Sequence, residues 1–367
     1  MRYAPARFAL ALLALAGAGL APQPTLAEEA VGVRTLTIPA PDRGTTLHGL
    51  LWYPAAPGGT SVLIGDDPPF RGTPARRDAP PAAGRFPLLL LSHGLGGGAA
   101  DLGWISARLA AAGYIVAAPN HPGTTGGDVS PAAALQVWQR PADLSAVLDA
   151  IEAAPAWRDR IDTGRVGVLG FSLGGYTALA IAGARVDAAA YARYCDTSKT
   201  PMWDCTWLQQ GGVDVHRIDA ARFGRSNRDP RIAFAIAVDP ALAPAYTAES
   251  LKGLPVPVEI INLGRPDTIP PMVAAAGVAA AIPGAAYETV PDAVHYSFLG
   301  ECVPDGAALL KREGLTEPLC DDGDGRPRAA LHAQLGRMIE TALQRLFRRR
   351  HAGDGRSGLR IQLFGTA

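Results

Sequence analysis

Runs of consecutive apolar residues alternate along this chain with segments in which apolar residues recur every three or four positions. The first pattern is typical of strands buried on both faces of a parallel sheet, and the second of helices that cover such a sheet. Strands are expected at residues 33–39, 46–54, 86–92, 114–119, 165–171, 231–238, 256–263 and 286–290. Helices are expected at residues 99–112, 141–154, 173–184, 270–281 and 329–348. This alternation predicts an α/β fold with a mainly parallel sheet flanked by helices.

Two segments interrupt the alternation. Residues 55–85 are rich in Pro, Gly, Asp and Arg without periodicity, and we expect an ordered surface loop there, after a hairpin of the first two strands at a sheet edge. Residues 184–230 are far longer than a helix-to-strand connection needs. They form an insertion before the sixth predicted strand, which is either a lid or pocket wall or only an outer lobe of the domain.

The N-terminal residues have the pattern of an export signal. Arg2 and Arg7 precede an apolar run at 8–21, which is short for a membrane span. We expect a signal peptide at 1–27, cleaved after Ala27, with an uncleaved anchor as the alternative. No second long apolar run follows, so no stable membrane span is expected after cleavage. Residues 28–367 then form one domain, with a flexible tail at 350–367.

Export changes the interpretation of the cysteines, because disulfides persist in oxidising compartments. Four are present, and short loops close at the least entropic cost, so we expect bonds from Cys195 to Cys205 and from Cys302 to Cys320. A zinc site is the alternative, but the chain has no CxxC motif and no histidine at ligand spacing from either pair. The expected location is the periplasm or the medium outside the cell.

Composition narrows the possible partners. The 34 basic and 34 acidic residues balance, and 48% of residues are apolar, which argues against a disordered chain. Nucleic-acid binding is not expected, because it requires a basic face. Loss of Arg2 and Arg7 with the signal leaves a slightly acidic protein.

The strongest chemical motif is GFSLGG at 170–175, which lies between a predicted strand and a predicted helix. In this setting a serine sits on a tight strand-to-helix turn, with glycines two residues to either side leaving room for backbone. The helix N-terminus offers backbone N–H groups to an oxyanion. We therefore predict Ser172 as a nucleophile and the Leu173 amide as an oxyanion donor.

A second glycine-rich motif, SHGLGG at 92–97, follows another predicted strand. Its position predicts the other half of an oxyanion hole, with the Leu95 amide as donor. Phosphate binding is the alternative for a glycine-rich loop. The spacing here does not fit G-x-G-x-x-G with a later acidic residue, and no Lys-Ser/Thr pair follows.

Seven histidines are candidates for the general base. His295 follows the last predicted strand, where the chain order Ser, acid, His places the base, whereas His93 and His121 lie in early turns and are expected to brace loops. Two aspartates are candidates for the acid that orients the imidazole. Asp267, in a G-x-x-D-x-x-P turn, is preferred slightly, and Asp239, at the end of a strand, is the alternative.

With these motifs in place, the chain resembles the α/β-hydrolase superfamily over nearly all its expected mature length. More narrowly, it is similar to bacterial predicted dienelactone hydrolases and platelet-activating-factor acetylhydrolases. The similarity rests on SHGLGG at 92–97, AAAGYIVAAPNHPG at 110–123, GFSLGG at 170–175, AVDPA at 237–241 and VHYSF at 294–298. True dienelactone hydrolases use a cysteine nucleophile, so their substrate does not transfer to a chain with Ser172.

The resemblance leaves both acids open. The acetylhydrolases take theirs from the strand that corresponds to the one ending at Asp239. Secreted polyester hydrolases and lipases take it from a turn that GRPDTIPP at 264–271 resembles.

The expected function is a secreted or periplasmic serine hydrolase that cleaves carboxylic esters through an acyl-enzyme. It needs no cofactor or metal and acts on a small-molecule or lipid-like ester. The alternatives are a peptidase or amidase of the same fold, or a catalytically silent binding protein on this scaffold.

Overall fold

A computed structural model describes residues 31–40, 43–197, 203–315, 317–323 and 325–354. The described chain contains a ten-stranded sheet of order β10-β9-β8-β7-β5-β6-β2-β1-β4-β3. Neighbouring strands from β10 to β6 are parallel. The strands are β1 (Val31–Ala40), β2 (Thr45–Pro54), β3 (Thr60–Ile64), β4 (Thr73–Arg77), β5 (Phe86–Ser92), β6 (Ile115–Pro119), β7 (Ile161–Phe171), β8 (Ala235–Val238), β9 (Val258–Leu263) and β10 (Ala286–Val290). The predicted α/β architecture with a mainly parallel sheet is confirmed.

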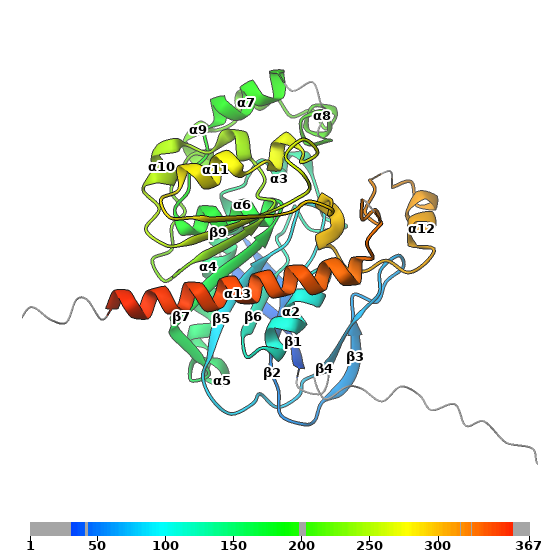
Figure 1. Cartoon of the computed structure of the whole chain (residues 1–367), viewed down its shortest axis with the longest axis vertical. Coiled ribbons are helices and arrows are strands. Elements are labelled where there is room, and N and C mark those ends of the chain that lie inside the picture. Colours follow the sequence, from blue (N-terminus) through cyan, green and yellow to red (C-terminus); the bar gives the residue numbers. More distant parts are fainter. Residues whose placement is uncertain (1–30, 41–42, 198–202, 316, 324, 355–367) are drawn as a thin grey trace, which may run out of the picture.

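Helices cover both faces of this sheet. One face packs against α2 and α13, which lie across the front of Figure 1, and the other packs against α4, α6 and α11. The longer helices are α2 (Gly103–Ala111), α4 (Gln139–Ala153), α6 (Leu173–Ala182), α7 (Ala188–Thr197), α8 (Trp203–Gln210) and α13 (Arg328–Asp354). The shorter ones are α3 (Pro131–Ala134), α5 (Pro155–Arg158), α9 (Ala220–Phe223), α10 (Ala248–Lys252), α11 (Ala276–Ala281) and α12 (Gly306–Arg312).

Three expectations about elements are corrected. Residues 55–85 do not form only a loop, because β3 and β4 lie there and pair with each other, and β4 contains a proline and two arginines that hide a strand pattern. The hairpin of β1 and β2 is consequently not at the edge, since β4 pairs with β1. The helix expected at 270–281 is a 3-10 turn, η4 (Pro271–Val273), followed by the short α11, in a segment that begins with two prolines.

The interior of the sheet explains why the apolar runs predicted it. Leu88 and Leu90 of β5 face one helical layer, and Leu89 and Leu91 face the other. A strand covered on both faces has no polar side to present to water. This rigid centre holds the turns that follow β5, β7 and β8 at one edge of the sheet.

The insertion at 184–230 carries helices of its own. It contains α7, α8, the 3-10 turn η2 (Val215–Arg217) and α9, which lie together at the top of Figure 1. A disulfide from Cys195 to Cys205 joins α7 to α8, and a second joins Cys302 to Cys320. Both predicted pairings are confirmed.

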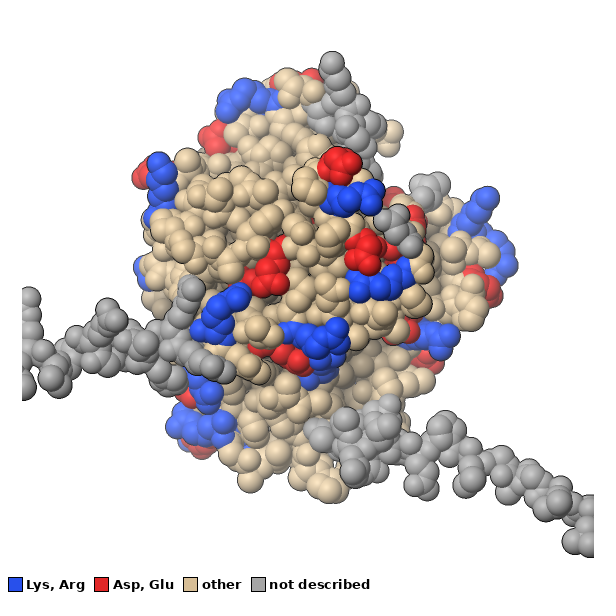
Figure 2. Space-filling view, in the orientation of Figure 1, with Lys and Arg blue, Asp and Glu red and all other residues tan. Residues whose placement is uncertain are grey.

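Charged residues are mixed on the face that α13 covers. Figure 2 shows acidic and basic side chains side by side there, and ion pairs such as Arg108 with Glu340 account for this pattern. Within the described residues, no helix is long and apolar enough to cross a membrane. The expected signal at 1–27 and most of the expected tail at 350–367 lie outside the described residues.

Candidate active site

Ser172 lies on the turn between β7 and α6, as its motif predicts. Its backbone φ is 57°, a left-handed conformation that a non-glycine residue rarely adopts. The turn is tight because β7 and α6 join without a connecting loop. A side chain at Gly170 would overlap the carbonyl of Gly174, and one at Gly174 would overlap the carbonyl of Ser92. The glycines therefore permit a turn that presents the serine hydroxyl outward.

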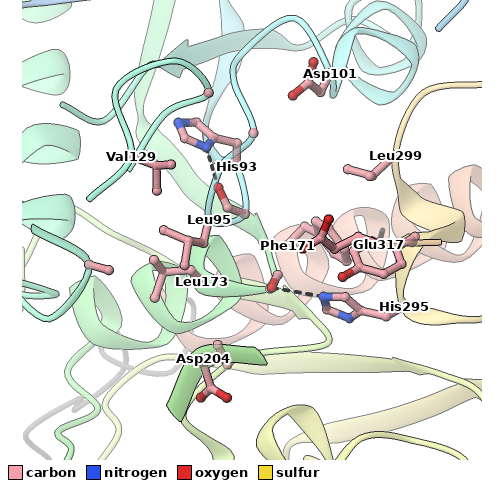
Figure 3. A pocket seen from close by; sticks show the side chains of 18 of the residues that line it. His93, Leu95, Asp101, Val129, Phe171, Leu173, Asp204, His295, Leu299 and Glu317 are labelled. Carbon is pink, nitrogen blue, oxygen red and sulfur yellow. Dashed lines mark hydrogen bonds between the residues drawn. The ribbon is translucent and has the colours of Figure 1, made fainter. Parts of the chain in front are cut away.

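His295 approaches this serine from another part of the chain. It begins the 3-10 turn η5 (His295–Phe298), which follows β10. Its Nε2 lies 3.1 Å from Ser172 Oγ, the contact drawn as a dashed line in Figure 3. The Phe171 ring, 4.8 Å away between centroids, packs beside the imidazole. The structure thus brings together the two residues that the sequence singled out as nucleophile and base.

The structure corrects the expected order of the two acids. Asp239 Oδ2 lies 2.8 Å from His295 Nδ1, and the Asp239 side chain is fully buried. Asp267 is 79% exposed and pairs at 3.8 Å with Arg265. The reason is topological: Asp239 ends β8, next to β7 in the sheet, and so lies under the imidazole. The turn after β9 directs Asp267 into solvent.

Asp239 is held by two further donors that the sequence did not reveal. Its Oδ1 accepts hydrogen bonds from Asn262 Nδ2 at 2.7 Å and from the Leu263 amide at 2.8 Å. Asn262 is itself fixed, because its Oδ1 accepts the Ala275 amide at 2.9 Å. These bonds satisfy a buried carboxylate that, among the described residues, has no lysine or arginine as a partner. A lone asparagine inside an apolar strand was the only sequence signal for this role.

The two residues whose amides are predicted as oxyanion donors both lie beside Ser172. Leu95 and Leu173 line one cavity together with Ser172. Among the hydrogen bonds between described residues, neither amide has an acceptor. The loop and the serine are close, since a Cβ built on Gly94 would lie 3.3 Å from Ser172 Cβ. Two N–H groups are therefore free to bind an oxygen beside the serine.

The cavity has a volume of about 590 Å³, which is the size of a small-ligand site. Its walls are mainly apolar, and Tyr191, Trp207 and Leu208 bring the 184–230 insertion into them. Asp101, Asp204 and Glu317 also line it, and no lysine or arginine among the described residues does. Burial raises the pKa of Asp204 to about 6, although hydrogen bonds from the Cys205 amide and the Tyr191 hydroxyl act to lower that pKa. The charge that this cavity presents is therefore negative or zero.

His93 and His121 belong to a buried polar cluster beside the site, and the His93 residue also lines the cavity. His121 Nε2 is 3.0 Å from Ser92 Oγ, and its Nδ1 is 2.8 Å from Asp143 Oδ2. Burial and the charge of Arg140 lower the pKa of His121 to about 4. Burial alone would raise the pKa of Asp143, but hydrogen bonds from Arg43 and His121 bring it below its usual value.

The family model of the alpha/beta hydrolase fold matches residues 87–228. A ferulic acid esterase from Streptomyces cinnamoneus is 21% identical, with 87% of this chain and 90% of that chain covered and a TM-score of 0.58. The chain has the α/β-hydrolase fold. Its site residues follow in the order Ser172, Asp239, His295, which is the order of the triad in α/β hydrolases.

Two other solved structures are similar to this chain at lower identity. A dienelactone hydrolase from Anabaena variabilis is 13% identical, with 78% and 95% of the two chains covered and a TM-score of 0.42. A dienelactone hydrolase-like promiscuous phosphotriesterase from metagenomic libraries is 13% identical, with 86% and 99% covered and a TM-score of 0.48. No curated protein sequence matches the chain significantly. Among the described residues, no three His, Cys, Asp or Glu side chains converge as metal ligands would.

Proposed function

We propose that this protein is a serine hydrolase of carboxylic esters. The observation that carries the proposal is the chain of hydrogen bonds from Ser172 through His295 to Asp239, beside a cavity lined by Leu95 and Leu173, whose amides have no acceptor among the described residues. An ester carbonyl in this cavity would meet a nucleophile, a base and oxyanion donors at once.

Each group has a defined part in the reaction. Ser172 Oγ attacks the carbonyl carbon while His295 Nε2 takes the hydroxyl proton, and the amides of Leu95 and Leu173 bind the oxygen that becomes negative. His295 returns the proton to the departing alcohol, which leaves an acyl group on Ser172. A water molecule then repeats the sequence and releases the acid. Asp239 keeps His295 Nε2 as the acceptor and stabilises the imidazolium.

Hydrolysis of p-nitrophenyl butyrate tests this proposal. The wild-type protein should release p-nitrophenol, and Ser172→Ala should reduce kcat to near the uncatalysed rate. Ser226→Ala is a suitable control, because it changes a serine in the 184–230 insertion that does not line the cavity. Equal rates in wild type and Ser172→Ala would refute the proposal. The matching p-nitroanilide separates an esterase from an amidase.

We also propose that the substrate is uncharged and largely apolar. The support is the cavity wall, which carries three carboxyl groups and no described lysine or arginine. An anionic substrate would meet repulsion in a setting where water screens charges weakly. Methyl-terminated p-nitrophenyl valerate should therefore exceed the mono-p-nitrophenyl ester of glutaric acid in kcat/KM. Glu317→Gln should narrow that ratio, and an equal preference for both esters in the wild type would contradict the idea.

Export to an oxidising compartment remains part of the proposal. It is supported by the pattern of residues 1–27 and by the two disulfides. N-terminal sequencing of the protein expressed with its own leader should begin at Glu28, and a periplasmic or medium fraction should contain it. An intact Met1 N-terminus in the cytoplasmic fraction would contradict export.

A further inference from the structure

The His93 side chain contacts the peptide group that carries one proposed oxyanion donor. The ring is buried, with Nδ1 2.7 Å from the carbonyl oxygen of Gly94, the contact drawn as a dashed line in Figure 3. On the other side of the ring, Nε2 accepts the backbone N–H of His121 at 3.2 Å. The mechanism above does not use His93.

Nε2 also lies 3.3 Å from Thr125 Oγ1, a hydroxyl that can donate or accept and that donates to the His121 carbonyl at 2.9 Å. The two backbone neighbours therefore determine where the proton of the ring resides. A backbone carbonyl only accepts hydrogen bonds and a backbone amide only donates them, so Nδ1 must carry the proton and Nε2 must be bare. The opposite tautomer would bring the Nδ1 lone pair against the Gly94 oxygen. Burial, then the nearby charges of Arg140 and His121, hold the pKa of His93 well below its usual value. The ring is therefore neutral at the pH of an ester assay.

The geometry of the peptide bond connects this contact to the oxyanion hole. In a trans peptide, the C=O of one residue and the N–H of the next point to opposite sides. A Gly94 carbonyl held toward His93 thus directs the Leu95 N–H away from His93. We propose that His93, through its Nδ1–H bond to Gly94, positions the Leu95 amide as an oxyanion donor. This inference rests on the proposed function of the site.

The peptides that follow in the loop are anchored separately, because the Gly96 amide donates to the Thr124 carbonyl at 2.9 Å and the Gly97 carbonyl accepts the Gly126 amide at 3.0 Å. The Gly94–Leu95 peptide makes neither of these bonds, and Gly94 has no side chain to hinder its rotation. Among the described residues, the Gly94 oxygen also accepts the Gly97 amide, at 3.4 Å, which is long for a hydrogen bond. His93 supplies the shorter contact.

The buried cluster in turn fixes His93. The Arg140 guanidinium donates to the carbonyl oxygen of His93, to Thr124 Oγ1 at 2.6 Å and to Ser92 Oγ at 3.3 Å. His121, whose amide binds the His93 ring, is anchored to Ser92 and Asp143. His93 is thus a positioning residue whose own backbone and ring are both held.

Three substitutions of His93 test the proposal through kcat and KM. Asn places an N–H near the position of Nδ1, Gln places its amide farther out, and Ala has no donor. We expect His93→Ala and His93→Gln to lower kcat by about 30-fold to 100-fold, because an oxyanion-hole donor contributes about that much or more. KM should change by less than about threefold. His93→Asn should recover most of kcat.

The control is His216→Ala, which changes an exposed histidine of the insertion and should leave both constants unchanged. Thermal unfolding of each variant reports whether it is folded at the assay temperature. Unchanged kcat in folded His93→Ala, or equal losses in His93→Asn and His93→Ala, would overturn the proposal. If Ser172→Ala retains wild-type activity instead, the proposed function fails, and the following measurement still decides the role of His93.

The structural readout does not depend on ester hydrolysis. Nitrogen-15 NMR of histidine-labelled protein, with the His93 signals assigned from His93→Asn, should show a proton on Nδ1 and none on Nε2. A crystal structure of His93→Ala should show the Gly94 carbonyl rotated from its wild-type direction. An Nε2–H tautomer, or an unmoved Gly94–Leu95 peptide in His93→Ala, would overturn the inference.

Discussion

Two chains of serine, histidine and aspartate lie in this molecule with nearly the same hydrogen-bond lengths. In the site, His295 is 3.1 Å from Ser172 and 2.8 Å from Asp239. In the buried cluster, His121 is 3.0 Å from Ser92 and 2.8 Å from Asp143. Distances alone therefore do not distinguish a nucleophilic serine from a structural one.

The surroundings make the difference. Ser172 lines a cavity beside two unpaired amides, whereas Ser92 is fully buried and accepts a hydrogen bond from Arg140. A base must also be able to take a proton. His295 pairs with the Asp239 carboxylate at 2.8 Å, while burial and then the positive charge of Arg140 lower the pKa of His121 to about 4. Access to a cavity, nearby amides and local charge are therefore the grounds on which we propose catalysis for Ser172 and a structural role for Ser92.

Replacing each serine with alanine should give the largest difference in kcat between the two chains of hydrogen bonds. Ser172→Ala should lower kcat for p-nitrophenyl butyrate by about 10,000-fold or more, because it removes the attacking atom. Ser92→Ala should lower kcat by less than about tenfold, and should cost about 1–3 kcal/mol of unfolding free energy, because it leaves a buried imidazole nitrogen without its partner. Steady-state kinetics and urea unfolding measure both. Comparable losses of kcat in the two variants would contradict the assignment.

The acids give the next largest contrast. Asp239→Asn should reduce kcat by about 10,000-fold, because the imidazole loses the group that sets its tautomer and stabilises its charge. Asp267→Asn should change kcat by less than twofold, since that carboxyl group faces solvent. The reverse ranking in the ester assay would show that the site rearranges around Asp267.

The free energy of unfolding, unlike kcat, should depend strongly on the buried cluster. Asp143→Ala should cost about 3–5 kcal/mol of unfolding free energy, because it leaves the buried charge of Arg140 without compensation and unpairs Arg43. Asp149→Ala, on the same helix but exposed, is the matched control and should cost less than about 0.5 kcal/mol. Urea midpoints that coincide for the two variants would contradict a buried ionic cluster.

The smallest expected effect is on the pH dependence of stability. The pKa of His121 is lowered to about 4 in the folded protein, against about 6.5 when unfolded. Between these values the unfolded chain binds more protons, so acidification should destabilise the fold from about pH 6.5 down to about pH 4. His121→Gln should reduce this slope by up to one proton. An unchanged slope of unfolding free energy against pH would show that His121 does not enter folding as a buried neutral group.

Local sequence predicted the parts of the site that depend on local structure. Ser172 and Leu173 could be predicted because a strand, a glycine turn and a helix follow one another within a few residues. His295 could be predicted because the chain order serine, acid, histidine places the base after the last strand. The choice between Asp239 and Asp267 could not be made from sequence. It depends on which strand end lies beneath the imidazole, and both acids follow strands.

The buried cluster escaped prediction for a related reason. Arg140 and Asp143 lie at the start of a helix, yet Arg140 donates to Ser92 at the end of β5 and Asp143 bonds His121 in the turn after β6, 48 and 22 residues earlier in the chain. Similarly, β4 was missed because its register with β1 joins polar residues such as Arg76 and Arg77 to the sheet. Polar residues that pair with distant polar residues leave no periodic signal in sequence.

The most direct test of the account is covalent labelling by a fluorophosphonate, which reacts readily only with an activated serine. Peptide mapping of the labelled protein should locate one adduct, on Ser172. Labelling should disappear in Ser172→Ala and persist in folded Ser92→Ala. An unlabelled wild-type protein, or an adduct that survives in Ser172→Ala, would contradict the claim that the open chain of serine, histidine and aspartate is the catalytic one.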